Sequence, residues 1–146
     1  MGPKIDIRWI QRYANFHKAC QRLLEVTEGG LSIDDLSELE QEGLVQRFEY
    51  TFELAWKVLQ DLLEYKGYEF MSDPNGTLKM AFEDGLITNH EGWRKMAKSR
   101  NTLSHVYDDE EARAITSLIF SEYAPLLKEL DDELEALSQD QQYQQS

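Results

Sequence analysis

Hydrophobic residues recur three or four positions apart along most of this chain, the spacing of one face of an α-helix. The pattern predicts four main helices and one short one, at about 5–27, 39–65, 77–84 (the short helix), a segment N-capped by Asn89, and about 109–137. We find no segment with the two-residue period of a strand. We therefore predict an all-α fold, an antiparallel up-and-down helical bundle, as a single domain over residues 1–138. The Gln-rich stretch 139–146 is predicted to be a disordered tail.

Residues that stop, start or bend helices stand between these repeats. The glycine pair 29–30 is expected to end the first helix, because glycine readily adopts the left-handed conformation found at helix ends. The stretch 72–76, which contains Pro and Asn-Gly, is interpreted as a turn. Asp108 and Glu111 have the spacing of a capping box, which predicts the start of the last helix. Pro125 lacks a backbone N–H and is predicted to kink that helix.

The helix at 39–65 carries two features besides its main hydrophobic stripe. Tyr50 and Trp56 lie off the stripe, which predicts that this helix buries more than one face. Glu49 and Glu53 share a face, as metal ligands or an acid–base pair would. Because Lys57 follows Glu53 by four residues, we favour a surface ion-pair ladder.

One histidine and one cysteine fall on the stripe of the first helix. His17 has no second ligand-type residue one turn away, so we interpret it as a hydrogen-bonded core or interface residue. Cys20 is the only cysteine in the chain, which excludes an internal disulfide, and its apolar register predicts an inert core residue.

Composition narrows the class of protein. The chain has 146 residues, 41% of them hydrophobic and 29% charged, as in a globular domain. It shows no membrane-spanning run and no signal peptide, so we expect a cytoplasmic protein without membrane contact. No metal cluster or cofactor motif is present, and neither a metal nor a cofactor is expected.

Net charge is −13, yet the segment 92–107 contains four cations and no carboxylate. Such a basic island on an acidic body can direct a polyanion to one place. Arg94, Lys95 and Lys98 are therefore candidates for binding RNA or nucleotide phosphate. The alternative is that these cations are simply the solvated face of a helix.

The same segment ends in a cluster of candidate catalytic residues. Arg100 falls in line with apolar positions of the helix, and Asn101 and His105 project together from an adjacent face. Tyr107 would lie under Arg100 if the helix continued that far. His105 is suited to proton transfer near neutral pH, and Arg100 is suited to binding phosphate. The alternative is an Arg and a His that cap the helix and bond backbone carbonyls.

The sequence R-N-T-L-S-H-V-Y at 100–107 resembles the R-x4-H-x-Y signature of the HEPN superfamily. The stretch 47–57 resembles the second-helix signature of one HEPN branch, the HepT-like or nucleotidyltransferase substrate-binding proteins. Ala81-Phe82, Gly85-Leu86-Ile87 and Trp93 match that branch in order and spacing. The resemblance covers roughly residues 7–137.

The resemblance implies a toxin of a toxin–antitoxin pair, a metal-independent ribonuclease whose two Arg–His motifs meet at a cleft in a homodimer. Arg100 would stabilise the phosphate, Asn101 would orient its neighbours, and His105 would transfer the proton. The implied partner is a cognate small nucleotidyltransferase that acts as antitoxin and adenylylates Tyr107.

Two other functions stay open at this stage. The older family label implies a non-catalytic nucleotide- or substrate-binding subunit of a two-component nucleotidyltransferase. In that case Arg100, Lys98 and Tyr107 would bind the nucleotide and His105 would only hydrogen-bond. A third hypothesis is an interaction protein with a vestigial motif.

Overall fold

A computed structural model of the chain describes residues 8–140, and within this range it contains helices and no strand. In chain order the elements are α1 (Arg8–Thr27), the 3₁₀ helix η1 (Ile33–Asp35), α2 (Glu38–Tyr65), α3 (Pro74–Asp84), α4 (His90–Leu103), α5 (Asp109–Leu118), the π-helical segment η2 (Ile119–Tyr123) and α6 (Ala124–Ser138). The predicted all-α bundle is confirmed. Most of the predicted tail, and the predicted first turn at 5–7, lie outside the described residues.

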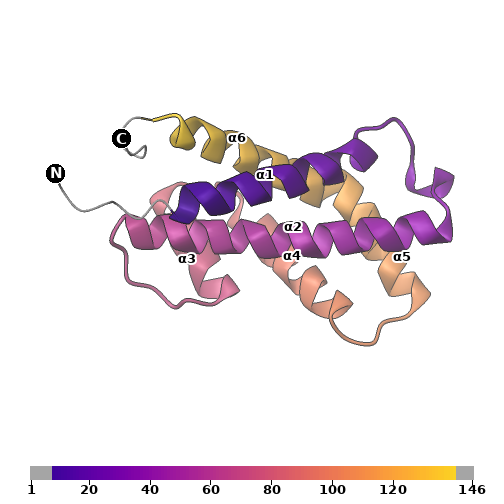
Figure 1. The fold of residues 1–146 in the computed structure, drawn as a ribbon. Coiled ribbons are helices and arrows are strands. Elements are labelled where there is room, and N and C mark those ends of the chain that lie inside the picture. The colour runs from indigo at the N-terminus through magenta and orange to yellow at the C-terminus, as the bar shows by residue number, and fades with distance from the viewer. Residues whose placement is uncertain (1–7, 141–146) are drawn as a thin grey trace.

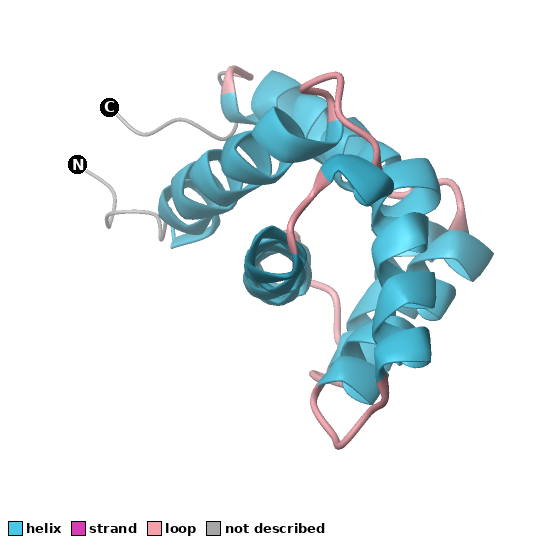
Figure 2. Cartoon of the chain, turned by 90° about the vertical axis from the view of Figure 1, so that its right-hand side faces the viewer, coloured by secondary structure: helices cyan, strands magenta, loops and turns pink. Residues whose placement is uncertain are grey.

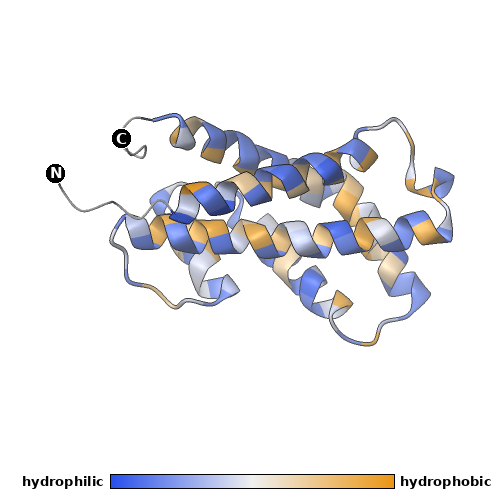
Figure 3. Cartoon of the chain, viewed as in Figure 1, coloured by the Kyte–Doolittle hydropathy of each residue, from blue (hydrophilic) through white to orange (hydrophobic). Residues whose placement is uncertain are grey.

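The long helix α2 lies at the centre of the bundle. It runs antiparallel to α1, and α6 packs along the other side of α1 (Figure 1). In Figure 2 α2 is seen end-on, with the remaining helices in an arc above it and to its right. Hydrophobic positions recur along its whole length (Figure 3). No helix of the described part is both long and apolar enough to cross a membrane.

The start of α2 follows from a local exchange of hydrogen bonds. Ser37 accepts the backbone N–H of Glu40 at 3.1 Å, and the Glu40 carboxylate accepts that of Ser37 at 2.8 Å. Farther along, Trp56 packs against the core as expected for a second buried face. Tyr50 does not, because its side chain is 61% exposed. The prediction that α2 buries more than one face is therefore wrong at Tyr50.

The stretch 72–76 is not a simple turn. Asp73 accepts the backbone N–H of Gly76 at 2.7 Å and caps a helix whose first residue is Pro74. Proline fits this position because the first N–H groups of a helix have no partner within it. Helix α3 therefore begins three residues earlier than the sequence pattern indicated.

The last long helix is interrupted where Pro125 was expected to bend it. The N–H of Ala124 bonds the carbonyl of Ile119, the spacing of a π-helix. This wider turn lies just before Pro125, which has no N–H of its own to donate. The helix changes direction here between α5 and α6 (Figure 1).

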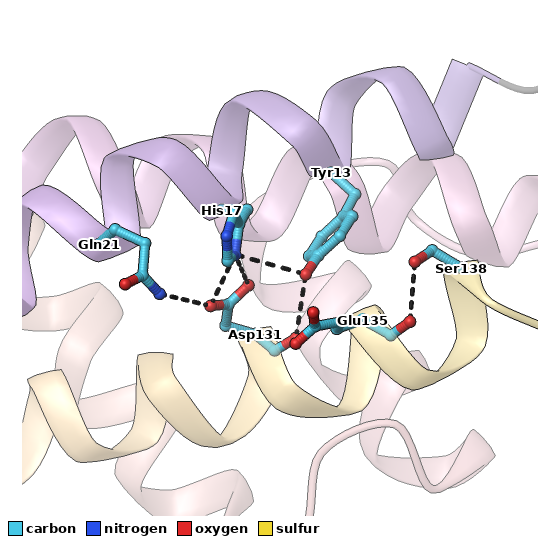
Figure 4. A network of polar contacts seen from close by, with 6 residues as sticks. All are labelled: Tyr13, His17, Gln21, Asp131, Glu135 and Ser138. Carbon is cyan, nitrogen blue, oxygen red and sulfur yellow. Dashed lines mark hydrogen bonds and ion pairs between the residues drawn. The ribbon is translucent and has the colours of Figure 1, made fainter.

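A polar cluster joins α1 to α6 (Figure 4). His17 Nδ1 lies 2.9 and 3.0 Å from the two carboxylate oxygens of Asp131, and Gln21 donates to the same carboxylate at 3.3 Å. The Tyr13 hydroxyl donates to the Asp131 backbone carbonyl at 3.4 Å. The expectation of a hydrogen-bonded His17 is confirmed. Cys20 is fully buried, as predicted.

Candidate functional site at the end of helix α4

Helix α4 presents the motif from a firmly packed base. Asn89 accepts the Gly92 N–H at 2.9 Å, which confirms it as the N-cap. Trp93 and its neighbours on that face are buried. Near the C-terminal end the Ser99 hydroxyl lies 2.6 Å from the Tyr123 hydroxyl, which also donates to the Lys95 carbonyl at 3.3 Å. This buried bond anchors α4 to the π-helical segment, one residue before Arg100.

The helix ends at Leu103, earlier than the motif does. The Ser104 N–H bonds the carbonyls of Arg100 and Asn101, and the chain then leaves the helix. Tyr107 consequently does not lie under Arg100 on a continued helix. It belongs to the loop that leads to α5, where Asp108 and Glu111 form the predicted capping box.

Arg100 reaches across to α2 and bonds an acidic residue there. Its Nη2 lies 3.2 Å from Glu53, whose other oxygen lies 3.2 Å from Lys57 Nζ. The predicted Glu53–Lys57 pair is therefore present, and Arg100 joins it. Arg100 Nη1 also donates to the Ser104 hydroxyl at 3.2 Å, while its buried Nε has no protein partner. The guanidinium is held in place and remains about one-third exposed, at 31%.

His105 is held by one nitrogen and free at the other. Its Nδ1 lies 2.7 Å from the backbone carbonyl of Asn101, which can only accept, so Nδ1 carries a proton. In the neutral imidazole Nε2 is then the acceptor. The residue is exposed, so this nitrogen is available to a substrate proton.

Tyr107 lines a groove of about 510 Å³ between α2 and α5 and is 40% exposed. Glu49 of α2 lines the same groove. Burial raises the pKa of Glu49, and the nearby Arg100 guanidinium lowers it in part. Glu49 therefore shares a groove with Tyr107 and interacts electrostatically with Arg100, although the phenol and the guanidinium are on different elements.

The predicted phosphate-binding residues share a second hollow, of about 670 Å³, on the outer side of α4. Three cations, three amides and two carboxylates line it: Arg94, Lys95, Lys98, Asn75, Asn89, Asn101, Glu91 and Glu122. Arg94 lies 3.4 Å from Glu91 and Lys95 lies 3.1 Å from Glu122. Among the described residues, Lys98 has no ion-pair partner.

One residue of the site, Glu53, is not predicted from the sequence as a contact of the motif. Glu53 was interpreted only as a partner of Lys57, and its contact with Arg100 joins two helices that no periodicity relates. The signal that was available is the pair Glu49 and Glu53 on one face of α2, which is oriented toward α4. Within residues 8–140, no three His, Cys, Asp or Glu side chains are placed to hold a metal ion.

Fold and motif together define a small all-α protein of the HEPN class. A family model described as nucleotidyltransferase substrate binding protein like matches residues 11–136. The chain belongs to this family, the HepT-like branch. It is 31% identical over 107 residues to a probable ribonuclease HepT of Haemophilus influenzae, with 69% of each chain covered.

Two solved structures share the architecture. A Thermus thermophilus protein superposes with a TM-score of 0.71 at 34% identity, over 82% of this chain and 98% of the other. A Haemophilus influenzae protein, described as having the fold of a substrate binding domain of a nucleotidyltransferase, gives 0.57 at 20% identity, over 89% and 99%. The second likeness concerns the fold alone.

Proposed function

We propose that this protein is a HEPN-type toxin, a metal-independent endoribonuclease paired with a small nucleotidyltransferase antitoxin. The observation that carries the proposal is the state of His105. Its Nδ1 is bound to the Asn101 carbonyl at 2.7 Å, its other nitrogen is an exposed acceptor, and Arg100 lies on the preceding turn.

The chemistry needs no metal because RNA carries its own nucleophile. His105 Nε2 accepts the proton of a ribose 2′-hydroxyl, and the 2′-oxygen attacks the adjacent phosphorus. The bond from phosphorus to the 5′-oxygen breaks and leaves a 2′,3′-cyclic phosphate. Arg100 donates hydrogen bonds to the phosphate oxygens, where negative charge increases in the transition state.

A second acid is required to protonate the departing 5′-oxygen. In a homodimer the second copy's His105 supplies it, which gives a reason for two motifs to share one cleft. The Asn101 backbone carbonyl fixes the tautomer of His105, and the Asn101 residue lines the same hollow as Lys98. Arg94, Lys95 and Lys98 hold the RNA backbone along α4.

The antitoxin partner acts at Tyr107. The phenol oxygen attacks the α-phosphate of ATP, and pyrophosphate leaves. The attached AMP adds negative charge and bulk to the loop between His105 and α5. Exposure of 40% in a groove leaves the phenol accessible to an enzyme.

A second candidate function is a nucleotide-binding subunit without nuclease activity. The observation that favours it is the hollow beside α4, in which three amides accompany the cations. Amides can read a base edge while lysine and arginine bind phosphates. The paired state of Arg100 also suits a structural role for that residue.

The deciding experiment is RNA cleavage by the purified protein in excess EDTA, beside His105→Ala, with the mass of each protein measured intact. We expect the unmodified wild type to cut RNA in EDTA and His105→Ala to be inactive. A wild type free of AMP that cuts none of a varied RNA panel would reject the nuclease and favour the binding subunit.

A further inference from the structure

A second basic groove lies between α1 and α2, outside the motif. It has a volume of about 440 Å³. Buried Ala19 and Thr51 form its floor, where the Thr51 hydroxyl lies 3.4 Å from the Ala19 carbonyl. Its exposed rim consists of Asn15, Lys18, Arg22, Arg47 and Tyr50.

The charge of this groove is unusual for the molecule. Three cations line it and no carboxylate does, although the chain has 28 acidic residues and 15 basic ones. Lys18 and Arg22 are one helical turn apart, where like charges repel. Their side chains make no hydrogen bond or ion pair to other described residues. An anion placed in the groove would relieve this repulsion.

Arg47 is oriented toward the same groove by the main chain. Its Nη1 donates to the Arg22 carbonyl at 2.8 Å, which holds the guanidinium across the gap between the two helices. Its other nitrogens remain available to a phosphate. The groove thus combines one guanidinium held by a backbone carbonyl with two exposed cationic side chains, as a site for successive phosphates would.

Tyr50 supplies a second kind of contact. Its ring is 61% exposed, the largest exposure of any aromatic residue in the described core-forming helices. An exposed ring beside cations is the combination that binds unpaired bases, because each base has a face that can stack. Asn15, across the groove, offers an amide that can hydrogen-bond to a base edge.

The groove and the motif lie on adjoining faces of one helix, α2. Tyr50 precedes Glu53 by three residues on α2, which is about 5 Å along the helix axis. Glu53 in turn contacts Arg100 at 3.2 Å. An RNA strand leaving the motif therefore has only the adjoining face of α2 to pass before it reaches the groove.

We propose that this groove binds single-stranded RNA, with phosphates on Lys18, Arg22 and Arg47 and a base stacked on Tyr50. It anchors the part of the strand that flanks the cleaved bond. The identity of the ligand as RNA rests on the proposed function, whereas the phosphate and base contacts follow from the groove itself.

The test is RNA binding in the His105→Ala background, which separates binding from cleavage. The probe is a fluorescent single-stranded RNA of roughly twelve nucleotides, measured by anisotropy over a range of salt concentrations. Arg22→Glu is compared with Lys79→Glu, the same change of charge sign at an exposed position on α3. We expect Arg22→Glu to weaken binding about tenfold and to lower the salt dependence, and Lys79→Glu to change little.

A second pair of variants tests the aromatic contact. Tyr50→Ala should weaken binding roughly fivefold or more, Tyr50→Trp should restore it, and a duplex of the same sequence should bind more weakly than the single strand. All of these positions are exposed, so circular dichroism should show the same fold in each variant.

Equal RNA affinities for Arg22→Glu and Lys79→Glu would contradict RNA binding in this groove, even if the wild type proves to be a nuclease. If wild type cuts no RNA but Arg22→Glu and Tyr50→Ala still weaken binding, the nuclease proposal fails and the groove stands. The two proposals therefore fail separately.

Discussion

Two histidines of this chain are each bound through Nδ1, and their surroundings differ in one decisive respect. His17 faces Asp131 on another helix, whose side chain is only 4% exposed. His105 bonds a carbonyl at the end of its own helix and is exposed. The first contact joins α1 to α6. The second fixes a tautomer and leaves the rest of the ring exposed.

The acidic residues of the two regions, Asp131 and Glu53, also differ in exposure. The Asp131 carboxylate is nearly buried and accepts from His17 and Gln21, which are themselves partly exposed, so its removal leaves these donors to water alone. Glu53 pairs with Arg100 at a site where both side chains are about one-third exposed, so water can replace either partner. We therefore expect the α1–α6 cluster to contribute stability and the motif to contribute activity.

After loss of the His105 imidazole, loss of the Arg100 guanidinium should have the largest effect on RNA cleavage. Arg100→Ala is expected to lower RNA cleavage by about 10²–10³-fold, because a donor to the transition-state phosphate is removed. Arg100→Lys should stay impaired, since an ammonium lacks the planar fork. Lys57→Ala is the matched control, because it removes the other cation bound to Glu53. Equal cleavage by Arg100→Ala and Lys57→Ala in a single-turnover assay would contradict the role of Arg100.

Removal of the buried carboxylate should come next. Asp131→Ala is expected to lower the free energy of unfolding by about 1–3 kcal/mol, since His17 and Gln21 lose their shared acceptor. Asp132→Ala, at an exposed position of the same helix, should change it little. Urea unfolding followed by circular dichroism measures both. Similar urea midpoints for the two variants would show that the contacts of Asp131 do not stabilise the fold.

The bond beneath the motif should have an intermediate effect. Ser99→Ala breaks the buried 2.6 Å contact with Tyr123 and should destabilise the protein by about 1 kcal/mol. Ser117→Ala, an exposed serine on α5, serves as the control in the same thermal melts. If the two serine variants melt at the same temperature, the contact does not anchor α4.

The smallest effect is expected for thiol labelling of the native protein at Cys20. Burial raises the pKa of its thiol to about 12, so the thiol stays protonated at about pH 8 and does not supply the reactive thiolate. A thiol reagent should label it only after unfolding in urea. Rapid labelling of the native protein would mean that the α1 side of the core opens easily.

The helices could be predicted from the sequence because their signals are local. Three- and four-residue repeats located the long helices, and Asn89 and the pair Asp108 and Glu111 located two of their starts. The stretch 72–76 was misread because an Asp-Pro pair serves a turn and a helix start equally well. The π-helical segment before Pro125 had no local signal that separates it from a simple kink.

The site was predictable only where its residues are neighbours in the chain. Asn101 and His105 are close in the chain, but His105 lies beyond the end of α4 and its ring bonds the Asn101 backbone carbonyl, which is the helix-capping alternative and not the predicted pair of side chains on one helix face. Glu53 and Arg100 meet through the packing of α2 on α4, which no repeat encodes. Tyr107 depends on where α4 ends, and the early end at Leu103 moved it into the groove between α2 and α5.

The central claim is that His105 serves activity and His17 serves stability. Its most direct test measures RNA cleavage and the free energy of unfolding for an alanine variant of each histidine. We expect His105→Ala to lose RNA cleavage in EDTA while its free energy of unfolding changes by less than about 0.5 kcal/mol. His17→Ala should keep cleavage and lose about 1 kcal/mol of stability. Loss of cleavage by a stable His17→Ala, or full cleavage by His105→Ala, would contradict the account.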